Sequence, residues 1–134
     1  MAILLFAIIP VSCGSDDDSN SECDDVFCTL EFITIVVTII DQNQDPFALD
    51  SFQVVNLENG EDITIPLTPS ELTEAQERGI YPLVSDGVFG LNQEKQIQFK
   101  GFLNNQEVIS SDYVVETDCC HLSSVSGDLE LTIQ

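Results

Sequence analysis

Short runs of apolar and β-branched residues, separated by polar turn residues, recur along the chain from residue 29 onward. The first run, residues 29–41 (TLEFITIVVTIID), is apolar on both of the faces that alternate along a strand. One face carries Ile33, Ile35, Val37 and Ile39, and the other carries Leu30, Phe32, Val36 and Ile40. Strands of this kind belong to the centre of a packed structure, and the run is too short to span a bilayer. We therefore expect residues 29–41 to form a central core strand.

Later segments also have strand patterns, and turn residues separate them. They are residues 49–57 (LDSFQVVNL), 61–66 (EDITIP), 95–103 (KQIQFKGFL), 106–116 (QEVISSDYVVE) and 128–134 (DLELTIQ). The expected turns are Glu58-Asn59-Gly60 and Asn104-Asn105. In the last segment Leu129, Leu131 and Ile133 alternate with polar residues, which predicts a strand with one face in water.

One segment, residues 68–79 (TPSELTEAQERG), has helical signals instead. The signals are the capping-box pair Thr68 and Glu71, Pro69 at the first helical position and Gly79 at the stop. Because only Leu72 and Ala75 in this segment are apolar, we predict a short surface helix that links two strands.

These elements predict an all-β fold. About seven short strands at this spacing, with one short surface helix, are typical of an antiparallel β-sandwich. A chain of 134 residues has room for one domain of this kind.

The segment VTIIDQNQDPFALDSFQVVNLENGED, residues 37–62, resembles the first hairpin of carboxypeptidase regulatory-like (transthyretin-like) domains. Those domains begin with a strand, a D-x-N/D-G-x-P turn and a second strand bearing a valine; here Gln44 takes the place of the glycine. The resemblance implies a transthyretin-like sandwich in a non-catalytic part of a surface protein. An immunoglobulin-like topology also fits the strand pattern.

The N-terminus reads as a processing segment. Residues 2–9 (AILLFAII) match the apolar region of a secretory signal peptide. Val11-Ser12-Cys13 followed by Gly14-Ser15-Asp16-Asp17-Asp18 resembles the lipobox and acidic tract of Bacteroidetes-type surface lipoproteins. The absence of a basic residue before the apolar run would fit a start upstream of Met1.

This resemblance implies a division of the chain into a signal peptide (1–12), an acylated Cys13 with an acidic flexible tether (13–25), and a β-sandwich domain (26–134). It also implies an outer-membrane location, anchored by the lipid and facing either the cell surface or the periplasm. The membrane, reached through the lipid on Cys13, is then the first expected partner.

The charge narrows the list of other partners. The chain has 24 acidic and 3 basic residues, a net charge of −21, and its bases are Arg78, Lys95 and Lys100. Six of the acids lie in residues 14–25, which leaves 18 acids against 3 bases, a net charge of −15, for residues 26–134. Such a surface repels phosphate, so we expect no nucleic acid partner. An extracellular protein or glycan remains possible.

Four cysteines remain besides Cys13, namely Cys23, Cys28, Cys119 and Cys120. In an exported chain they predict disulfides, and four cysteines allow three pairings. We favour the crossed arrangement, in which Cys23 and Cys28 bond to the 119–120 pair, because it closes long loops. Since adjacent strand residues point to opposite faces, this arrangement requires a bulge or turn at Cys119-Cys120.

Two chemical alternatives involve His121, the only histidine. Zinc could be held by the cysteines and His121, but their spacing matches no common zinc pattern. A Cys–His nucleophile would need the thiolate and the imidazole within hydrogen-bond reach, and adjacent residues in a strand diverge. We expect no cofactor.

Residues Asp41, Asn43 and Asp45 have the oxygen spacing of a calcium loop. An EF-hand would continue with Gly and would have Glu at its twelfth position, where this chain has Pro46 and Phe52. The segment is therefore expected to be a turn, with Asp41, Asn43 and Asp45 only weak metal candidates.

Three function classes follow. The first is a non-catalytic surface binding or accessory module anchored in the cell envelope, and we favour it because no catalytic set of residues is evident. The second is a structural spacer or coat component. The third is a metal- or Cys-dependent enzyme using the Cys119-Cys120-His121 cluster.

Overall fold

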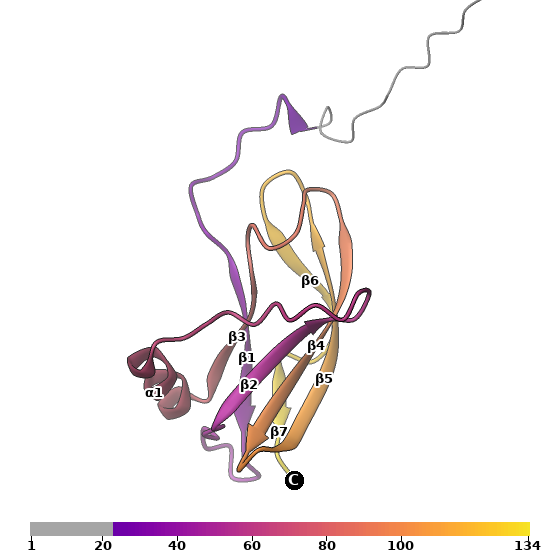
Figure 1. The fold of residues 1–134 in the computed structure, drawn as a ribbon. Helices are drawn as coiled ribbons and strands as arrows, with labels where there is room; N and C mark the ends of the chain where they lie inside the picture. Colours follow the sequence, from indigo (N-terminus) through magenta and orange to yellow (C-terminus); the bar gives the residue numbers. More distant parts are fainter. Residues whose placement is uncertain (1–22) are drawn as a thin grey trace, which may run out of the picture.

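The computed structural model describes residues 23–134 of the chain (Figure 1). The elements are β1 (Thr34–Ile40), β2 (Ser51–Asn56), α1 (Pro69–Arg78), β3 (Ile80–Ser85), β4 (Glu94–Leu103), β5 (Gln106–Thr117), β6 (Leu122–Ser126) and β7 (Glu130–Thr132). One sheet has the order β3-β1-β7 and the other has the order β2-β4-β5-β6. The predicted all-β sandwich with one short helix is confirmed.

All strand pairs are antiparallel except β1 and β7, which run parallel. This exception arises because the chain crosses from one sheet to the other after β6. Strand β6 pairs with β5 in one sheet, and β7 pairs with β1 in the other. Gly127 allows the crossing. Its φ is 108°, and a Cβ there would lie 2.5 Å from Cδ1 of Tyr113 and 2.6 Å from the carbonyl oxygen of Asp112. Only glycine fits so close an approach.

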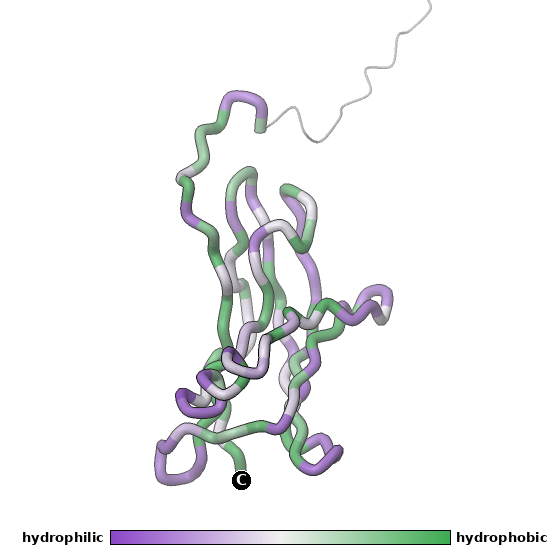
Figure 2. The backbone as a smooth tube through the Cα atoms, turned by 60° about the vertical axis from the view of Figure 1, so that its left-hand side comes forward, coloured by the Kyte–Doolittle hydropathy of each residue, from purple (hydrophilic) through white to green (hydrophobic). Residues whose placement is uncertain are grey.

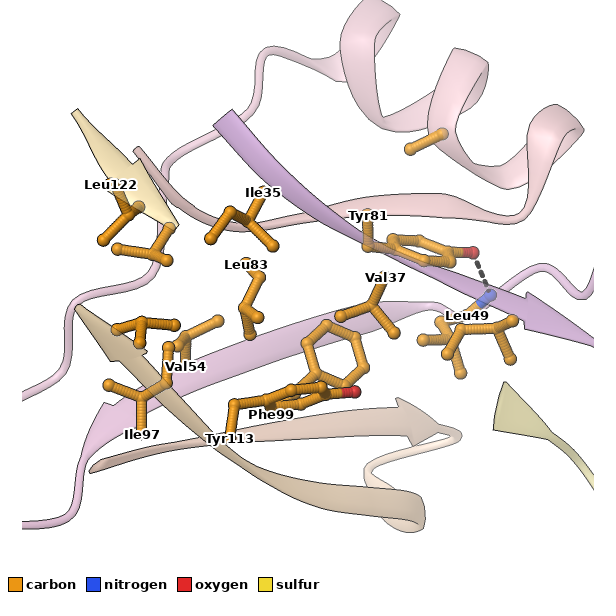
Figure 3. Close-up of a cluster of buried hydrophobic side chains, with 14 residues drawn as sticks. Ile35, Val37, Leu49, Val54, Tyr81, Leu83, Ile97, Phe99, Tyr113 and Leu122 are labelled. Atoms are coloured by element: carbon orange, nitrogen blue, oxygen red, sulfur yellow. Dashed lines mark hydrogen bonds between the residues drawn. The ribbon is translucent and has the colours of Figure 1, made fainter. Parts of the chain in front are cut away.

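The core lies between the two sheets and is apolar (Figure 3). Its largest fully buried side chains are Tyr81, Tyr113, Phe99, Ile39, Leu49, Leu83 and Ile97. The two tyrosines keep their hydroxyls bonded. Tyr81 donates to the carbonyl of Phe47 (2.9 Å) and accepts from the N–H of Leu49 (2.7 Å), and Tyr113 donates to the carbonyl of Asp128 (2.6 Å). Both tyrosines therefore fix loops to the core without leaving a buried polar atom unpaired.

The first predicted strand is shorter and more exposed than its sequence indicated. Strand β1 is central in its sheet, and Ile35, Val37 and Ile39 are buried as expected. Its other face is not part of the core, and Val36 is 39% exposed. The prediction of burial on both faces was wrong because a two-layer sandwich leaves each sheet an outer face, which α1 covers only in part. Residues 29–33, expected to belong to the strand, lie outside both sheets.

The helix follows its sequence signals. Thr68 accepts a hydrogen bond from the N–H of Glu71, and the Glu71 carboxylate accepts one from the N–H of Thr68, which completes the capping box. Gly79 ends the helix with φ at 67°, and a Cβ there would lie 2.5 Å from the carbonyl oxygen of Ile39. The predicted surface helix between two strands is confirmed.

Two expectations about strands need correction. Residues 61–66 make only an isolated bridge, between Asp62 and Val55. The Thr64 hydroxyl accepts the N–H of Val54 (2.8 Å), so a side chain takes a place that a strand backbone would occupy. Strands β3 and β6 were not among the segments identified from the sequence. The turn at Asn104-Asn105 is confirmed, and both residues have positive φ, as a two-residue hairpin turn requires.

Candidate functional site

The four cysteines of the described region form two disulfides. Cys23 bonds to Cys119, and Cys28 bonds to Cys120. The crossed arrangement favoured from the sequence is confirmed. The bridges join the segment that precedes β1 to the connection between β5 and β6, across sequence separations of 96 and 92 residues.

A turn makes this pairing possible, as expected. The Asp118 carboxylate accepts hydrogen bonds from the N–H groups of Cys120 (2.7 Å) and His121 (2.8 Å). These two bonds lower the pKa of Asp118, so the turn is stabilised by an ionised carboxylate. Because Cys119 and Cys120 lie in this turn and not in a regular strand, both sulfurs can face the same segment.

A hydrogen-bonded chain of side chains lies beside the disulfides. His121 Nδ1 is 2.8 Å from Asp86 Oδ2, and His121 Nε2 is 2.9 Å from Thr29 Oγ1. Since a carboxylate can only accept, Nδ1 donates to Asp86, and in the neutral imidazole Nε2 accepts from the Thr29 hydroxyl. Cys28 and Thr29 are thus attached in succession to Cys120 and His121.

Asp86 is the centre of this arrangement. Besides His121, its carboxylate accepts the N–H of Ile33 (2.9 Å), just before β1, and the N–H of Leu122 (2.8 Å), the first residue of β6. Burial raises the pKa of Asp86, but the hydrogen bonds from Ile33, His121 and Leu122 outweigh it, and the pKa lies below its usual value. One carboxylate therefore joins strands that belong to different sheets.

We call this set the clasp: the two disulfides, Thr29, His121, Asp86 and Asp118. Sequence reasoning found the cysteines and singled out His121, but it missed Thr29 and Asp86. Nothing local marks Asp86, which lies 35 residues from His121 in the chain. The sulfurs of Cys119 and Cys120 are bonded in disulfides, so in this state neither is a thiolate that His121 could activate.

The order hydroxyl, imidazole, carboxylate is also that of a nucleophile, a base and an orienting acid. Acyl transfer further requires donors for an oxyanion and a pocket for the substrate. Thr29 is exposed. Five well-formed pockets lie on the described surface, and neither Thr29 nor His121 lines any of these five. The geometry supports a structural role for the three groups.

The clasp fixes an apolar segment that the domain does not cover. We call residues 24–33 the arm; it stands beyond the ends of the strands in Figure 1, and Figure 2 shows hydrophobic stretches along it. Phe27 is 100% exposed, Leu30 105%, Phe32 71% and Val26 46%. Exposed apolar side chains in series, unlike scattered ones, are typical of interaction surfaces.

The charges around these side chains have one sign. Asp24, Asp25 and Glu31 lie on the arm, and within residues 23–134 none of their carboxylates has an ion-pair or hydrogen-bond partner. The basic residues lie elsewhere: Arg78 pairs with Glu74 on α1, and Lys95 pairs with Glu58. The arm is therefore both apolar and anionic.

The predicted turn at residues 41–45 is stabilised by a side-chain oxygen of Asp41. Asp41 Oδ1 accepts the N–H groups of Asn43 (2.8 Å) and Asp45 (3.1 Å), and Gln44 has φ at 67°. The weak metal candidates Asp41, Asn43 and Asp45 thus form a self-bonded turn. No group of three or more His, Cys, Asp or Glu side chains arranged for a metal ion occurs in residues 23–134.

Cys13, the predicted signal segment 1–12 and the acidic residues up to 22 lie outside the described residues. In the part that is described, no helix has the length and apolar character needed to cross a bilayer. Comparison of the chain with known protein families, characterised proteins and solved structures gives no significant match.

Proposed function

We propose that the protein is a lipid-anchored module of the outer membrane, attached through Cys13, and that it binds an extracellular protein or glycan through the arm. The single observation that carries the binding role is the series Phe27, Leu30 and Phe32, exposed on a segment that is covalently fixed. A segment free to move would bury such side chains on the nearest apolar surface. Here the clasp keeps them apart from the sandwich.

The position of the first disulfide supports the anchoring role. Nine residues separate Cys13 from Cys23, so the link between lipid and domain spans at most about 35 Å. Tension on the lipid would reach the domain at Cys23 and pass directly to Cys119. The bridge would therefore relieve the arm and the start of β1 of part of this load, which helps the binding surface to keep its shape close to a membrane.

Two measurements test the two halves of this proposal. For the anchor, cells fed an alkyne-labelled fatty acid should label the wild type and leave Cys13→Ser unlabelled. For the binding role, a photoreactive benzoylphenylalanine in place of Phe27 should cross-link an envelope component on intact cells. The same residue in place of Glu77, exposed on α1, is the matched control. Absence of label, or equal cross-linking from both positions, contradicts the corresponding half.

The order of Thr29, His121 and Asp86 matches a nucleophile, a base and an orienting acid, so acyl transfer with the Thr29 hydroxyl as nucleophile is the second candidate to be tested. Turnover of p-nitrophenyl acetate by the wild type, compared with Thr29→Val, distinguishes the two. A binding module should show equal background rates in both proteins. A rate that is higher in the wild type and is lost in Thr29→Val would favour the enzyme.

A further inference from the structure

We propose that residues 27–32 form a strand-pairing site for an extended partner segment in which apolar and basic side chains alternate. The inference rests on the proposed function and specifies the chemistry of the partner. The site consists of the unpaired backbone of the arm, its exposed apolar side chains and its uncompensated negative charge.

The backbone of the arm offers hydrogen bonds that the domain does not use. Within residues 23–134, no backbone N–H or carbonyl of residues 27–32 has a hydrogen-bond partner in the protein. The nearest bonds are the N–H of Val26 to the carbonyl of Cys23 and the two bonds that join Ile33 to Asp86. Such a run is what an exposed sheet edge presents to an added strand. Six residues also match the usual length of a strand.

The clasp holds this backbone in place before a partner arrives. Cys28 is bonded to Cys120, Thr29 to His121 and Ile33 to Asp86, so both ends of the run are fixed. Part of the entropy cost of ordering a binding segment is therefore met during folding, which favours association. The chain bends at Leu30, and no hydrogen bond of the described part fixes that bend, so pairing can straighten it.

The side chains define the apolar half of the partner. Phe27 and Phe32 are aromatic, and each such ring can bury about 150–250 Å². Leu30 lies between them and is fully exposed. In an extended arm Leu30 and Phe32 lie on one face and Phe27 on the other. A strand added beside the arm would place alternate side chains next to Leu30 and Phe32, so these alternate positions of the partner should be apolar.

The charges define the other half. Within residues 23–134, Asp24, Asp25 and Glu31 have no ion-pair or hydrogen-bond partner, and a second copy of the chain, at −21, would be repelled. An anionic lipid surface would be repelled for the same reason. Glu31 lies on the face opposite Leu30 and Phe32, so lysine or arginine at the remaining positions of the partner would lie next to it. Basic residues at the end of the partner would approach Asp24 and Asp25. A cationic extended segment is therefore the occupant that both the backbone and the charges favour.

The test uses the full acylated chain purified in non-ionic detergent and a synthetic peptide, KVKVKVK, acetylated and amidated at its ends. Hydrogen exchange measured by mass spectrometry, with reductant in the quench, reports on residues 24–33. At 90% occupancy, exchange should slow about tenfold for the alternate amides of residues 27–32 that point toward the added strand, because only the free fraction exchanges. The exchange of α1 should not change.

Two control peptides separate the contribution of charge from the contribution of backbone hydrogen bonds. EVEVEVE keeps the strand propensity and reverses the charge, and it should give no protection. KVKVKVK with N-methyl groups on two adjacent central residues keeps charge and apolarity but loses donors on both edges, and it should protect far less. Equal protection by the methylated peptide, binding without protection of residues 27–32, or protection by the acidic peptide would each overturn the inference.

These outcomes can be separated from failure of the proposed function. Cross-linking from position 27 on cells without peptide protection would retain the binding module and reject strand pairing. Protection without cross-linking would retain the pairing site and reject the proposed cellular role. Cross-linking of two copies of this chain to each other would reject the basic partner.

Discussion

The contribution of each disulfide to stability should depend on whether the other disulfide is present. When one bridge is present, it already closes the loop of more than 90 residues between the arm and the β5–β6 connection. The second bridge then closes only a small ring, made of residues 23–28 and 119–120. Their entropic contributions therefore cannot be additive.

The magnitudes follow from the loop lengths. A loop of 96 residues corresponds to about 4.7 kcal/mol of unfolded-state entropy, and a ring of about eight residues to about 2.5 kcal/mol. Removing either bridge alone, as Cys23→Ala with Cys119→Ala or as Cys28→Ala with Cys120→Ala, should lower the free energy of unfolding by about 2.5 kcal/mol. Removing both should lower it by about 7 kcal/mol, about 2 kcal/mol more than the sum of the two single losses.

Urea unfolding of the three variants, followed by far-ultraviolet circular dichroism and fitted to two states, measures these values. The chain-entropy reasoning would be refuted if the two single losses added up to the double loss. It would also be refuted if one bridge accounted for nearly all of the loss, since that would mean contacts at one bridge dominate. If the variant without both bridges is unfolded in the absence of urea, the double loss equals or exceeds the stability of the wild type, and the single losses still test the ring term.

Three other predictions concern the clasp, the arm and the sheet crossing. Because the pKa of Asp86 is lowered in the folded state, its contribution to stability is present above the ordinary carboxyl pKa of 3.8 and is lost as the pH falls through the folded-state pKa. Asp86→Asn should therefore lower the free energy of unfolding by about 3 kcal/mol at pH 7 and by much less at pH 2, and equal losses at both pH values would contradict this assignment. Chymotrypsin should cut the exposed arm first, at Phe27, Leu30 or Phe32. Cleavage after Leu30 or Phe32 leaves a non-reduced protein that is heavier by one water and separates into two pieces on reduction. Initial cleavage within the sandwich would mean that the arm is protected. Gly127→Ala should destabilise the domain by about 2–3 kcal/mol in thermal or urea unfolding, because the added Cβ would meet Tyr113. The matched control is Gly87→Ala, where φ is 88° and no atom lies within 4 Å of the added Cβ, and it should cost only about 1 kcal/mol. Equal effects would show that the contact with Tyr113 is unimportant.

The parts of the fold that could be predicted have local causes. The capping box of Thr68 and Glu71, the stop at Gly79 and the hairpin turn at Asn104-Asn105 each depend on residues within a few positions of one another. The crossed disulfides could be predicted because an even set of cysteines in two clusters leaves few pairings, and the need for a turn followed from strand geometry alone.

The parts that were missed depend on distant contacts or on mixed composition. Strand β3 contains Pro82, which tolerates only an edge position, and β6 is rich in serine, so neither has a clear strand pattern. Asp86 acquires its role only when β1 and β6 come together. The residues before Thr34 have the apolar alternation of a core strand, yet the clasp holds them away from the core. Their composition shows that they are apolar, but it does not show which surface they contact.

The central claim is that the clasped arm is a binding surface. Cross-linking from position 27 on intact cells tests this claim most directly. The comparison is between the protein with both disulfides and the Cys28→Ala, Cys120→Ala variant. This variant keeps the Cys23–Cys119 bridge and releases the middle of the arm. We predict a discrete cross-linked product in the clasped protein, a clear loss of yield in the released variant, and no product from position 77. No product from position 27, or equal yields from positions 27 and 77 in the clasped protein, would contradict the account.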